Sequence, residues 1–297
     1  MKQHEVTGSG GLRLHVREWG NPEGPPILFV HGVAQCHMCW EKQVAGELGR
    51  DFRLVAPDLR GHGMSDKPGT PDHYAEPELW AQDIAAVIET LELDRPVLVG
   101  WSLGGMVACD YLLHVGEDAV AGLNLVCGVV TPRLEDKGLM LGPGFTAHVE
   151  GLRSDDLPTR IDAVRAFLRD QTENDMPPET FERALGWNII VPPAVFSGIG
   201  ARERFSHAVL ERLGLPVLVS WGREDRVTLP RLADHILETC PTARASWYEA
   251  TGHQPFLEQS ERFDRELAAF VTEARAERPE AGPVAGPVAG PVAGAGR

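Results

Sequence analysis

The chain lacks any uninterrupted apolar run of about 18 residues, the length that a helix needs to cross a lipid bilayer. Residues 1–5 are mostly polar and include nothing like the apolar segment of a signal peptide. Positive charge is scarce: the chain has 28 Lys and Arg residues and 43 Asp and Glu residues, which gives a formal net charge of −15. Nucleic acids and anionic membranes both require clustered positive charge. We therefore expect neither a nucleic-acid nor a membrane partner, and a cytoplasmic protein.

Cysteine is also scarce, and its count of five fits a reducing compartment better than a disulfide framework. Cys36 and Cys39 form a C-x-x-C pair. Redox chemistry would require this pair in a thioredoxin-like context, which is absent, and zinc would require a second ligand pair. Cys109, Cys127 and Cys240 lie in apolar or isolated settings. We expect Cys36 and Cys39 to line a pocket, with any redox role left open, and no metal or organic cofactor.

Glycine and proline become dense only after about residue 273, where a Gly-Pro-Val-Ala repeat runs to the end of the 297-residue chain. Such a composition cannot build a core, so the repeat is predicted to be disordered, and whether it has a function stays open. It lacks the glycine at every third position that collagen requires. The whole chain is 43% hydrophobic, which is typical of a globular protein with a large core.

The chain before the repeat alternates between two kinds of pattern. Short apolar runs predict strands near residues 12–18, 26–30, 52–56, 96–100 and 121–126, and later near 215–222 and 245–249. Apolar residues recur at helical spacing over residues 77–91. Strands that alternate with helices indicate the α/β class, with a mostly parallel central sheet covered by helices on both faces.

The alternation stops near residue 128. Two helical segments, 161–171 and 178–189, follow without a good strand pattern. We predict that these helices form a cap inserted between two strands of the sheet. The predicted parts are residues 1–127 as the first part of the α/β core, 128–214 as the cap, 215–273 as the second part of the core, and 274–297 as the disordered tail.

Residues 96–105 read Pro-Val-Leu-Val-Gly-Trp-Ser-Leu-Gly-Gly, an apolar strand that runs into Gly-x-Ser-x-Gly. This pattern is typical of a sharp strand-to-helix turn with a strained serine, in which small residues on either side let strand and helix approach closely. The turn would hold the Ser102 hydroxyl at a helix N-terminus, where the dipole favours developing negative charge. We interpret Ser102 as a nucleophile rather than as part of an ordinary turn.

A serine nucleophile needs a base and an orienting acid, which should follow it in the order acid, then histidine. The apolar run 215–222 leads into a loop with two adjacent carboxylates, Glu224 and Asp225. Asp225 is the better candidate, because the loop can turn its side chain back toward the serine, and Glu224 is the alternative. His253 lies on the loop after the strand predicted at 245–249 and is the candidate base.

The sequence resembles α/β-hydrolase-fold enzymes of the esterase, perhydrolase and C–C hydrolase type. The resemblance rests on Phe-Val-His-Gly at 29–32, Pro-Asp-Leu-Arg-Gly-His-Gly-Met-Ser-Asp at 57–66, the Ser102 motif, and the Asp225 and His253 loops. These segments span about residues 10–272, and their order and spacing are more specific than any one of them. The resemblance implies the α/β-hydrolase fold with an inserted helical cap.

The resemblance also implies the roles of the site residues. Ser102 would be the nucleophile, His253 the general base and acid, and Asp225 the residue that orients the imidazole. The backbone N–H groups of Val33 and Leu103 would form the oxyanion hole, in which one donor is worth about 3 kcal/mol.

Other polar residues of the matching segments are expected to be structural. His31 would be a buried histidine bonded to backbone that shapes the oxyanion loop. Asp58 precedes the serine and so breaks the expected order, which favours a pairing with nearby backbone. Residues 60–63, Arg-Gly-His-Gly, are expected to form a tight turn.

Large apolar side chains near these motifs and in the cap are candidates for the substrate pocket. The candidates are Trp40, Trp101, Phe145, Trp187 and Phe196. Trp101 is adjacent to the nucleophile and is expected to pack beneath or beside it.

The expected function is hydrolysis of a small to medium carboxylic ester, lactone or thioester through an acyl-enzyme. Cofactor-free perhydrolases and C–C bond hydrolases use the same triad, and sequence does not separate them from esterases. Haloalkane dehalogenases and epoxide hydrolases share the fold but use a carboxylate nucleophile, so Ser102 argues against both. A non-catalytic small-molecule receptor is a further alternative, since fold alone does not fix function. The physiological substrate and the oligomeric state stay open.

Overall fold

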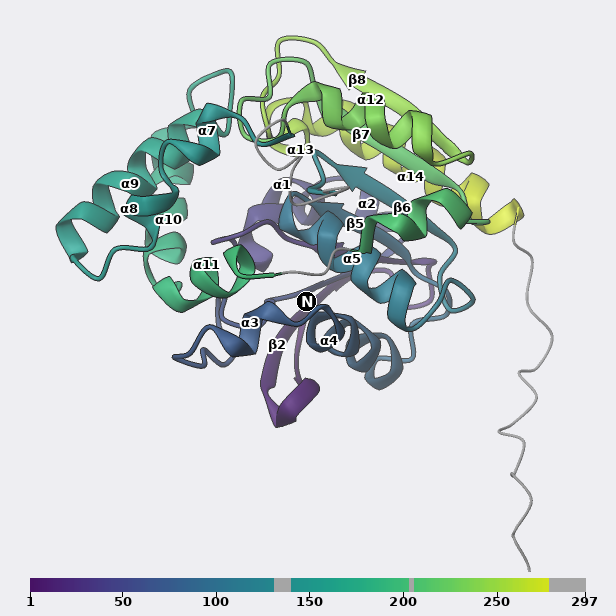
Figure 1. Cartoon of the computed structure of the whole chain (residues 1–297). Coiled ribbons are helices and arrows are strands. Elements are labelled where there is room, and N and C mark those ends of the chain that lie inside the picture. Colours follow the sequence, from purple (N-terminus) through teal and green to yellow (C-terminus); the bar gives the residue numbers. More distant parts are fainter. Residues whose placement is uncertain (131–139, 203–205, 278–297) are drawn as a thin grey trace, which may run out of the picture.

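Eight strands form one sheet in the part of the chain that the structure, a computed structural model, describes: residues 1–130, 140–202 and 206–277 (Figure 1). The strands are β1 (Lys2–Thr7), β2 (Arg13–Gly20), β3 (Pro26–Val30), β4 (Arg53–Pro57), β5 (Val97–Trp101), β6 (Gly122–Val126), β7 (Val217–Gly222) and β8 (Ala243–Tyr248). Their order is β1-β2-β4-β3-β5-β6-β7-β8. Pairing is antiparallel for β1–β2 and β2–β4 and parallel from β4 onward.

The central strands are apolar because both faces of the sheet are covered. Every residue of β3, β5, β6 and β7 is buried. The predicted strand positions and the α/β class are therefore confirmed. β1 was not predicted, because its sequence Lys-Gln-His-Glu-Val-Thr buries only Val6 at the edge of the sheet.

Two rows of helices cover the sheet (Figure 1). One row contains α4 (Pro77–Thr90), α5 (Leu103–His114), the 3-10 helix η4 (Ser206–Arg212) and α12 (Pro230–Thr239). The other contains α1 (Glu41–Ala45), α2 (Leu48–Asp51), α13 (Pro255–Glu258) and α14 (Ser260–Glu277). Three short helices, η1 (Ser9–Gly11), η2 (His37–Trp40) and α3 (Asp72–Ala75), lie in the loops. α5 follows the central strand β5, and its residues 103–112 are all buried.

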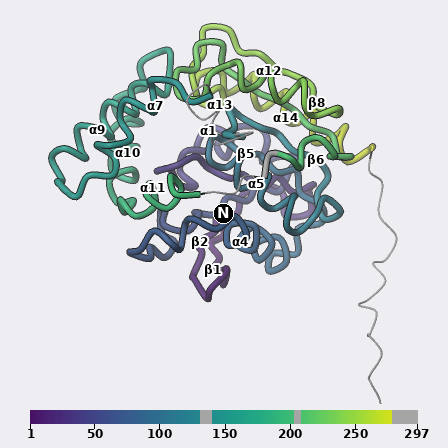
Figure 2. The backbone as a smooth tube through the Cα atoms, viewed as in Figure 1, coloured from purple at the N-terminus to yellow at the C-terminus, as the bar shows by residue number. Residues whose placement is uncertain are grey.

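Between β6 and β7 the described residues form helices α7 (Pro143–Thr146), α8 (Val149–Leu152), α9 (Leu157–Asp170), α10 (Pro178–Ile189) and α11 (Pro193–Gly200), followed by η4. Helices α7 to α11 lie together at the left of Figure 1, beside the sheet. Figure 2 shows the same excursion as a continuous teal and green path. The helices predicted at 161–171 and 178–189 correspond to α9 and α10. The role of this insertion as a cap stays a prediction.

The last helix, α14, is longer than expected. It extends to Glu277, so residues 274–277, which the composition had assigned to the disordered tail, are helical. The physical reason is that Ala274 packs into the core at 0% exposure. The rest of the predicted tail, 278–297, lies outside the described residues.

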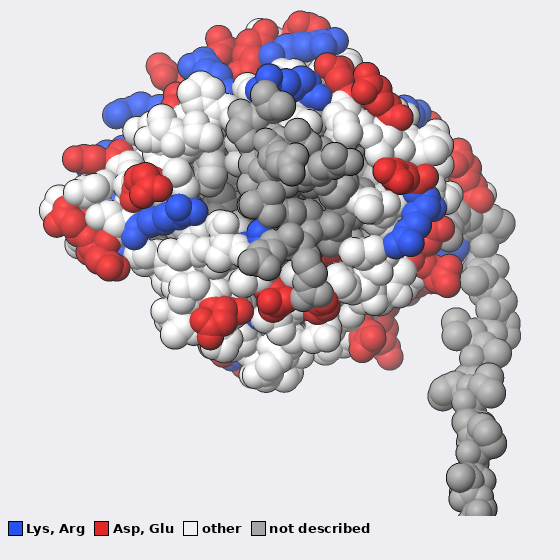
Figure 3. Space-filling view, in the orientation of Figure 1, with Lys and Arg blue, Asp and Glu red and all other residues white. Residues whose placement is uncertain are grey.

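The surface carries both signs of charge. On the face shown in Figure 3, acidic and basic side chains are interspersed around the rim. Among the helices of the described residues, none combines the length and the apolar character needed to span a membrane.

Candidate active site

Ser102 lies on the sharp turn between β5 and α5, with backbone angles φ 54° and ψ −116°. This left-handed conformation is strained for a residue with a side chain. A Cβ placed on Gly100 would lie 2.6 Å from the carbonyl oxygen of Gly104, and one on Gly104 would lie 2.0 Å from that of Val30. Both distances are far below contact, so the turn requires glycine two residues before and two residues after the serine.

The turn places Ser102 at the N-terminus of α5. Leu103 is the first residue of that helix, so its N–H has no acceptor within the helix. Ser102 is 5% exposed and, together with Leu103 and Val33, lines a pocket of the described residues that we call the main pocket. A serine hydroxyl, a helix N-terminus and a second backbone segment thus line the same cavity.

Asp225 lies on the loop after β7, and four donors surround its buried carboxylate. The backbone N–H groups of Val227 and Thr228 donate to Oδ1 at 2.8 and 3.0 Å. The hydroxyl of Thr228 and Nδ1 of His253 lie 2.9 and 2.8 Å from Oδ2. These contacts hold the carboxylate in one orientation.

His253 is buried and fixed at both its ring and its backbone. Since a carboxylate only accepts hydrogen bonds, the contact with Asp225 assigns the ring proton to Nδ1 and leaves Nε2 as the free base. The backbone N–H of His253 donates to the carbonyl of Gln171, and its carbonyl accepts from Nε1 of Trp101 at 2.9 Å. Trp101 precedes Ser102 directly, so this indole ties the histidine loop to the serine turn.

Glu224, the alternative acid, contacts the backbone of the His253 loop and not the imidazole. Its carboxylate accepts the backbone N–H of Thr251 at 2.9 Å, and its own N–H donates to the carbonyl of Thr251. It therefore braces the loop that carries His253, while Asp225 contacts the imidazole.

The loop after β3 carries His31, Gly32 and Val33. His31 is fully buried; its Nδ1 faces the carbonyl oxygen of Gly32 at 2.8 Å, and its Nε2 accepts the N–H of Leu59 at 3.0 Å. Burial lowers the pKa of His31 from 6.5 to about 4, so the ring is neutral. The expectation of a structural histidine is confirmed. A Cβ on Gly32 would lie 3.1 Å from Cβ of Ser102, so this loop packs directly against the serine.

The turn that begins at Asp58 is hydrogen-bonded to His31 and to the segment that follows the His31 loop. The carboxylate of Asp58 accepts the N–H groups of His37 and Met64, as expected, and it also faces the ring Nδ1 of His37 at 2.9 Å. These contacts connect the turn after β4 to the segment that follows the His31 loop.

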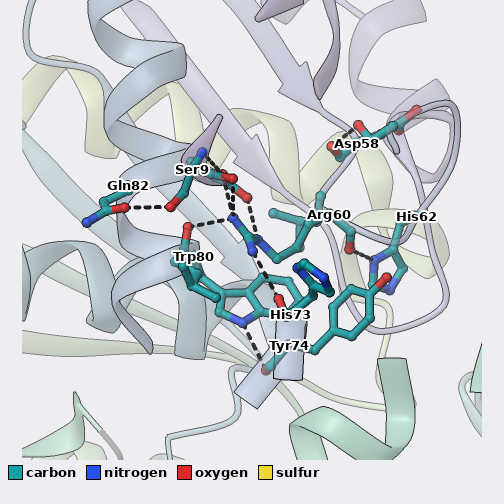
Figure 4. Close-up of polar contacts among 12 residues, drawn as sticks. Ser9, Asp58, Arg60, His62, His73, Tyr74, Trp80 and Gln82 are labelled. Carbon is teal, nitrogen blue, oxygen red and sulfur yellow. Dashed lines mark hydrogen bonds and ion pairs between the residues drawn. The ribbon is translucent and has the colours of Figure 1, made fainter. Parts of the chain in front are cut away.

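Arg60 anchors the same turn from the other side (Figure 4). Its guanidinium contacts both carboxylate oxygens of Asp83 on α4, at 2.7 and 2.8 Å. It also donates to the carbonyls of His73 and Leu79, at 2.9 and 3.0 Å, and lies over the ring of Trp80. Both members of this ion pair are buried. The pair fixes the turn whose Leu59 N–H holds His31.

The main pocket has a volume of about 270 Å³. Its lining is mostly apolar and comes from the core and from the helices between β6 and β7. The lining residues are Val33, Ser102, Leu103, Met106, Val129, Leu141, Phe145, Thr146, Val149, Arg153, Phe196, Ile199, Gly200, Val227 and Thr228. Two of the predicted pocket residues, Phe145 and Phe196, are among them.

The other three predicted pocket residues lie elsewhere. Trp40 is fully buried and packs against Phe256, with ring centroids 4.5 Å apart. Trp101 packs behind the serine turn, as expected for a neighbour of the nucleophile, but does not line the pocket. Trp187 donates to Oε1 of Gln35 at 2.8 Å and lines a separate, very small cavity. The aromatic character of a residue indicates that the side chain is buried. It does not indicate which cavity the side chain faces.

Cys36 and Cys39 are free and buried. Burial raises the pKa of both thiols above its ordinary value, which keeps them protonated. Cys39 lines the same small cavity as Trp187, and neither cysteine is among the residues of the main pocket.

Several positioning residues carry no sequence motif. Gln171, at the end of α9, accepts the N–H of His253 and also faces the side chains of Gln35 and Gln254, at 3.4 and 2.5 Å. It therefore joins the inserted helices to the loop after β3 and to the loop that carries His253. Thr228 and Arg153 were missed as well, because hydroxyl and arginine residues are common in loops and on helices.

Two groups of described residues place three potential metal ligands together. They are His15 with His37 and Asp58, and Cys127 with Asp225 and His253. In both groups the carboxylate already accepts several hydrogen bonds from protein groups, so its oxygens are engaged. We assign a metal to neither group.

Comparisons with known proteins agree with this architecture. The model of the alpha/beta hydrolase family matches residues 27–266. The crystal structure of esterase RhEst1 from Rhodococcus sp. ECU1013 has a TM-score of 0.84 and 34% identity, over 92% of this chain and 100% of that chain. The bifunctional esterase/perhydrolase DCH of Acinetobacter calcoaceticus and the non-heme chloroperoxidase of Streptomyces lividans are each 28% identical, over 90% of this chain and 98% of theirs.

Proposed function

The chain belongs to the alpha/beta hydrolase family and is an enzyme of the hydrolase type, and we propose that it cleaves small to medium carboxylic esters with a Ser-His-Asp triad. Lactones and thioesters need the same machinery and fall within the proposal. The observation that carries it is the strained backbone of Ser102 at the wall of an apolar pocket. Trp101 ties this turn to the loop of His253, whose imidazole a buried carboxylate orients.

The proposed reaction proceeds in two steps. The hydroxyl of Ser102 attacks the carbonyl carbon while Nε2 of His253 accepts its proton. The N–H groups of Val33 and Leu103 stabilise the oxyanion, and Asp225 stabilises the imidazolium. His253 then protonates the leaving alkoxide. Water, deprotonated by His253, attacks the acyl carbon; the bond to the Ser102 oxygen breaks, and that oxygen takes the proton back from His253. No step calls for a metal or an organic cofactor.

The test compares hydrolysis of p-nitrophenyl esters of increasing acyl length by the wild type and by Ser102→Ala. We expect kcat/KM to fall by about a thousandfold or more in the variant. Ser9→Ala is the matched control, because the Ser9 hydroxyl donates to the exposed Gln82 and neither residue lines the pocket. If Ser102→Ala and Ser9→Ala were equally active, Ser102 would not be the nucleophile.

A second candidate is perhydrolysis by the same triad, in which hydrogen peroxide instead of water attacks the acyl-enzyme. The names of the two 28% identical relatives, a chloroperoxidase and an esterase/perhydrolase, favour it. Peroxide-dependent bromination of monochlorodimedone in acetate buffer tests it, with Ser102→Ala as the control. Very slow turnover of all esters together with tight binding of a product would instead favour a receptor.

The cytoplasmic location stays a prediction. All five cysteines are free and buried, which is typical of proteins from reducing compartments. Fractionation of the cells that produce the protein would test it.

A further inference from the structure

Arg153 is the one charged residue among the described residues that line the pocket of Ser102. It follows α8 directly and belongs to the helices between β6 and β7. Its side chain is 34% exposed, so the guanidinium lies where the pocket meets solvent. Placing a cation beside a largely apolar lining costs free energy unless an anion or a hydrogen-bond acceptor pairs with it.

The partners that the guanidinium has are weak. Nη1 lies 3.5 Å from a carboxylate oxygen of Glu150, whose side chain is 87% exposed, and Nη2 lies 3.5 Å from the carbonyl oxygen of Phe196. Charge-assisted hydrogen bonds of this kind are normally about 2.7–2.9 Å long. Nε is buried and has no hydrogen-bond partner among the described residues. Within the described part of the chain, most N–H groups of Arg153 therefore have no close acceptor.

The neighbouring helix leaves space for this group. Gly200, which also lines the pocket, ends α11, and a Cβ on it would lie 2.1 Å from Nη2 of Arg153. A side chain at position 200 would therefore compete with the guanidinium for its place at the pocket wall.

We propose that Arg153 binds a carboxylate at the far end of the substrate's acyl chain, so that the preferred substrates are monoesters of dicarboxylic acids. The inference rests on the proposed function of Ser102. A carboxylate matches the planar fork of the guanidinium and would engage the donors that the protein leaves free. The methylene chain between the carboxylate and the reacting carbonyl would lie along the apolar lining, against Phe145, Val149 and Phe196.

The test uses two ester series of equal length: monomethyl esters of linear dicarboxylic acids with four to eight carbons, and methyl esters of the matching linear monocarboxylic acids. Methanol release is measured for the wild type, Arg153→Gln and Arg153→Lys. At the preferred chain length we expect Arg153→Gln to lower kcat/KM for the acidic ester by about tenfold or more, mainly through KM, and to leave the neutral ester within about twofold. Arg153→Lys keeps the charge without the fork and should lie between.

Arg165→Gln is the matched control, because Arg165 lies on α9, is half exposed and contacts only Asp162. It should change neither series. Equal losses on both series in Arg153→Gln would assign Arg153 a structural role and overturn the proposal, as would an unchanged preference. If the wild type hydrolysed neither series, or if Ser102→Ala were as active as the wild type, the proposed function itself would fail.

A binding measurement separates recognition from turnover. Calorimetric titration of Ser102→Ala with adipate and with hexanoate compares a dicarboxylate with a monocarboxylate of the same length. We expect adipate to bind about tenfold more tightly, and the difference to vanish in the Ser102→Ala/Arg153→Gln double variant and to shrink in high salt. Equal affinity of the two ligands for Ser102→Ala would contradict the proposal.

Discussion

The hydroxyl of Thr228 lies 2.9 Å from Oδ2 of Asp225, the same oxygen that faces Nδ1 of His253. Thr228 is fully buried on its loop and also lines the pocket of Ser102. One side chain therefore reaches from the pocket of Ser102 to the carboxylate that contacts His253. Hydrogen bonds to a charged group are among the stronger ones, so this contact should matter for the reaction.

Replacement of Thr228 by valine keeps the shape of the side chain and removes the hydroxyl. We expect Thr228→Val to lower kcat by about tenfold, because Asp225 loses one of the donors that orient it. Thr228→Ser retains the hydroxyl and should keep most of the activity. Steady-state kinetics with thermal melts as a folding check would measure both, and equal activity of the two variants would disprove the role of the hydroxyl.

The serine turn should tolerate no side chain at Gly104. In Gly104→Ala the new Cβ would meet the carbonyl oxygen of Val30 at 2.0 Å, which forces β3 and α5 apart. We expect the free energy of unfolding to fall by about 3 kcal/mol or more. Urea denaturation measures this. Gly69→Ala is the control, because nothing lies within 4 Å of a Cβ at that position, and a Gly104→Ala protein as stable as this control would refute the close packing.

The buried pair of Arg60 and Asp83 should be sensitive to the loss of one partner. Arg60→Met leaves the carboxylate of Asp83 buried without its cation, and we expect the free energy of unfolding to fall by about 3 to 5 kcal/mol. The double variant Arg60→Met/Asp83→Leu removes the uncompensated charge and should recover part of that loss. If the free energy of unfolding of the double variant fell by the sum of the losses in the two single variants, the two residues would not act as a pair.

The stability of the protein should decrease in weak acid. Burial lowers the pKa of His31 to about 4 and that of His62 to about 3, from an ordinary value of 6.5. Below pH 6.5 the unfolded chain therefore binds protons that the folded chain does not, and the free energy of unfolding falls as the pH decreases toward 4. Above pH 6.5 this contribution is fully present.

Urea denaturation at a series of pH values between 7.5 and 4.5 checks this dependence. His62→Gln removes one of the two groups, so its stability should fall less steeply over the same range, even if it starts from a lower value. A slope equal to that of the wild type would show that His62 does not contribute.

Much of the fold was predictable because its signals are local. The strands around residues 26–30, 96–100 and 121–126 are continuous apolar runs, and each is observed within one residue of its prediction. β1 was not predictable in this way, since its sequence contains few apolar side chains. It is a strand because it pairs with β2. The end of α14 was misjudged because its burial depends on contacts with the distant β6.

The sequence by itself determined the serine turn and the places of Asp225 and His253 in the chain. The turn depends on glycines two residues to either side of Ser102, a spacing that any reader of the chain can see. Asp225 and His253 each follow an apolar strand, and parallel strands bring their carboxyl ends to one edge of the sheet. These features are local or follow from the topology.

Only the tertiary structure decided which side chains share the pocket. Phe145 and Phe196 line it, whereas Trp40 and Trp187 do not, although all four are apolar. The same holds for Arg153, whose place beside the cavity depends on the space that Gly200 leaves on another helix. The hydrophobicity of a side chain determines that it is buried. The cavity that the side chain faces depends instead on how separate helices pack, and this packing is a property of the whole chain.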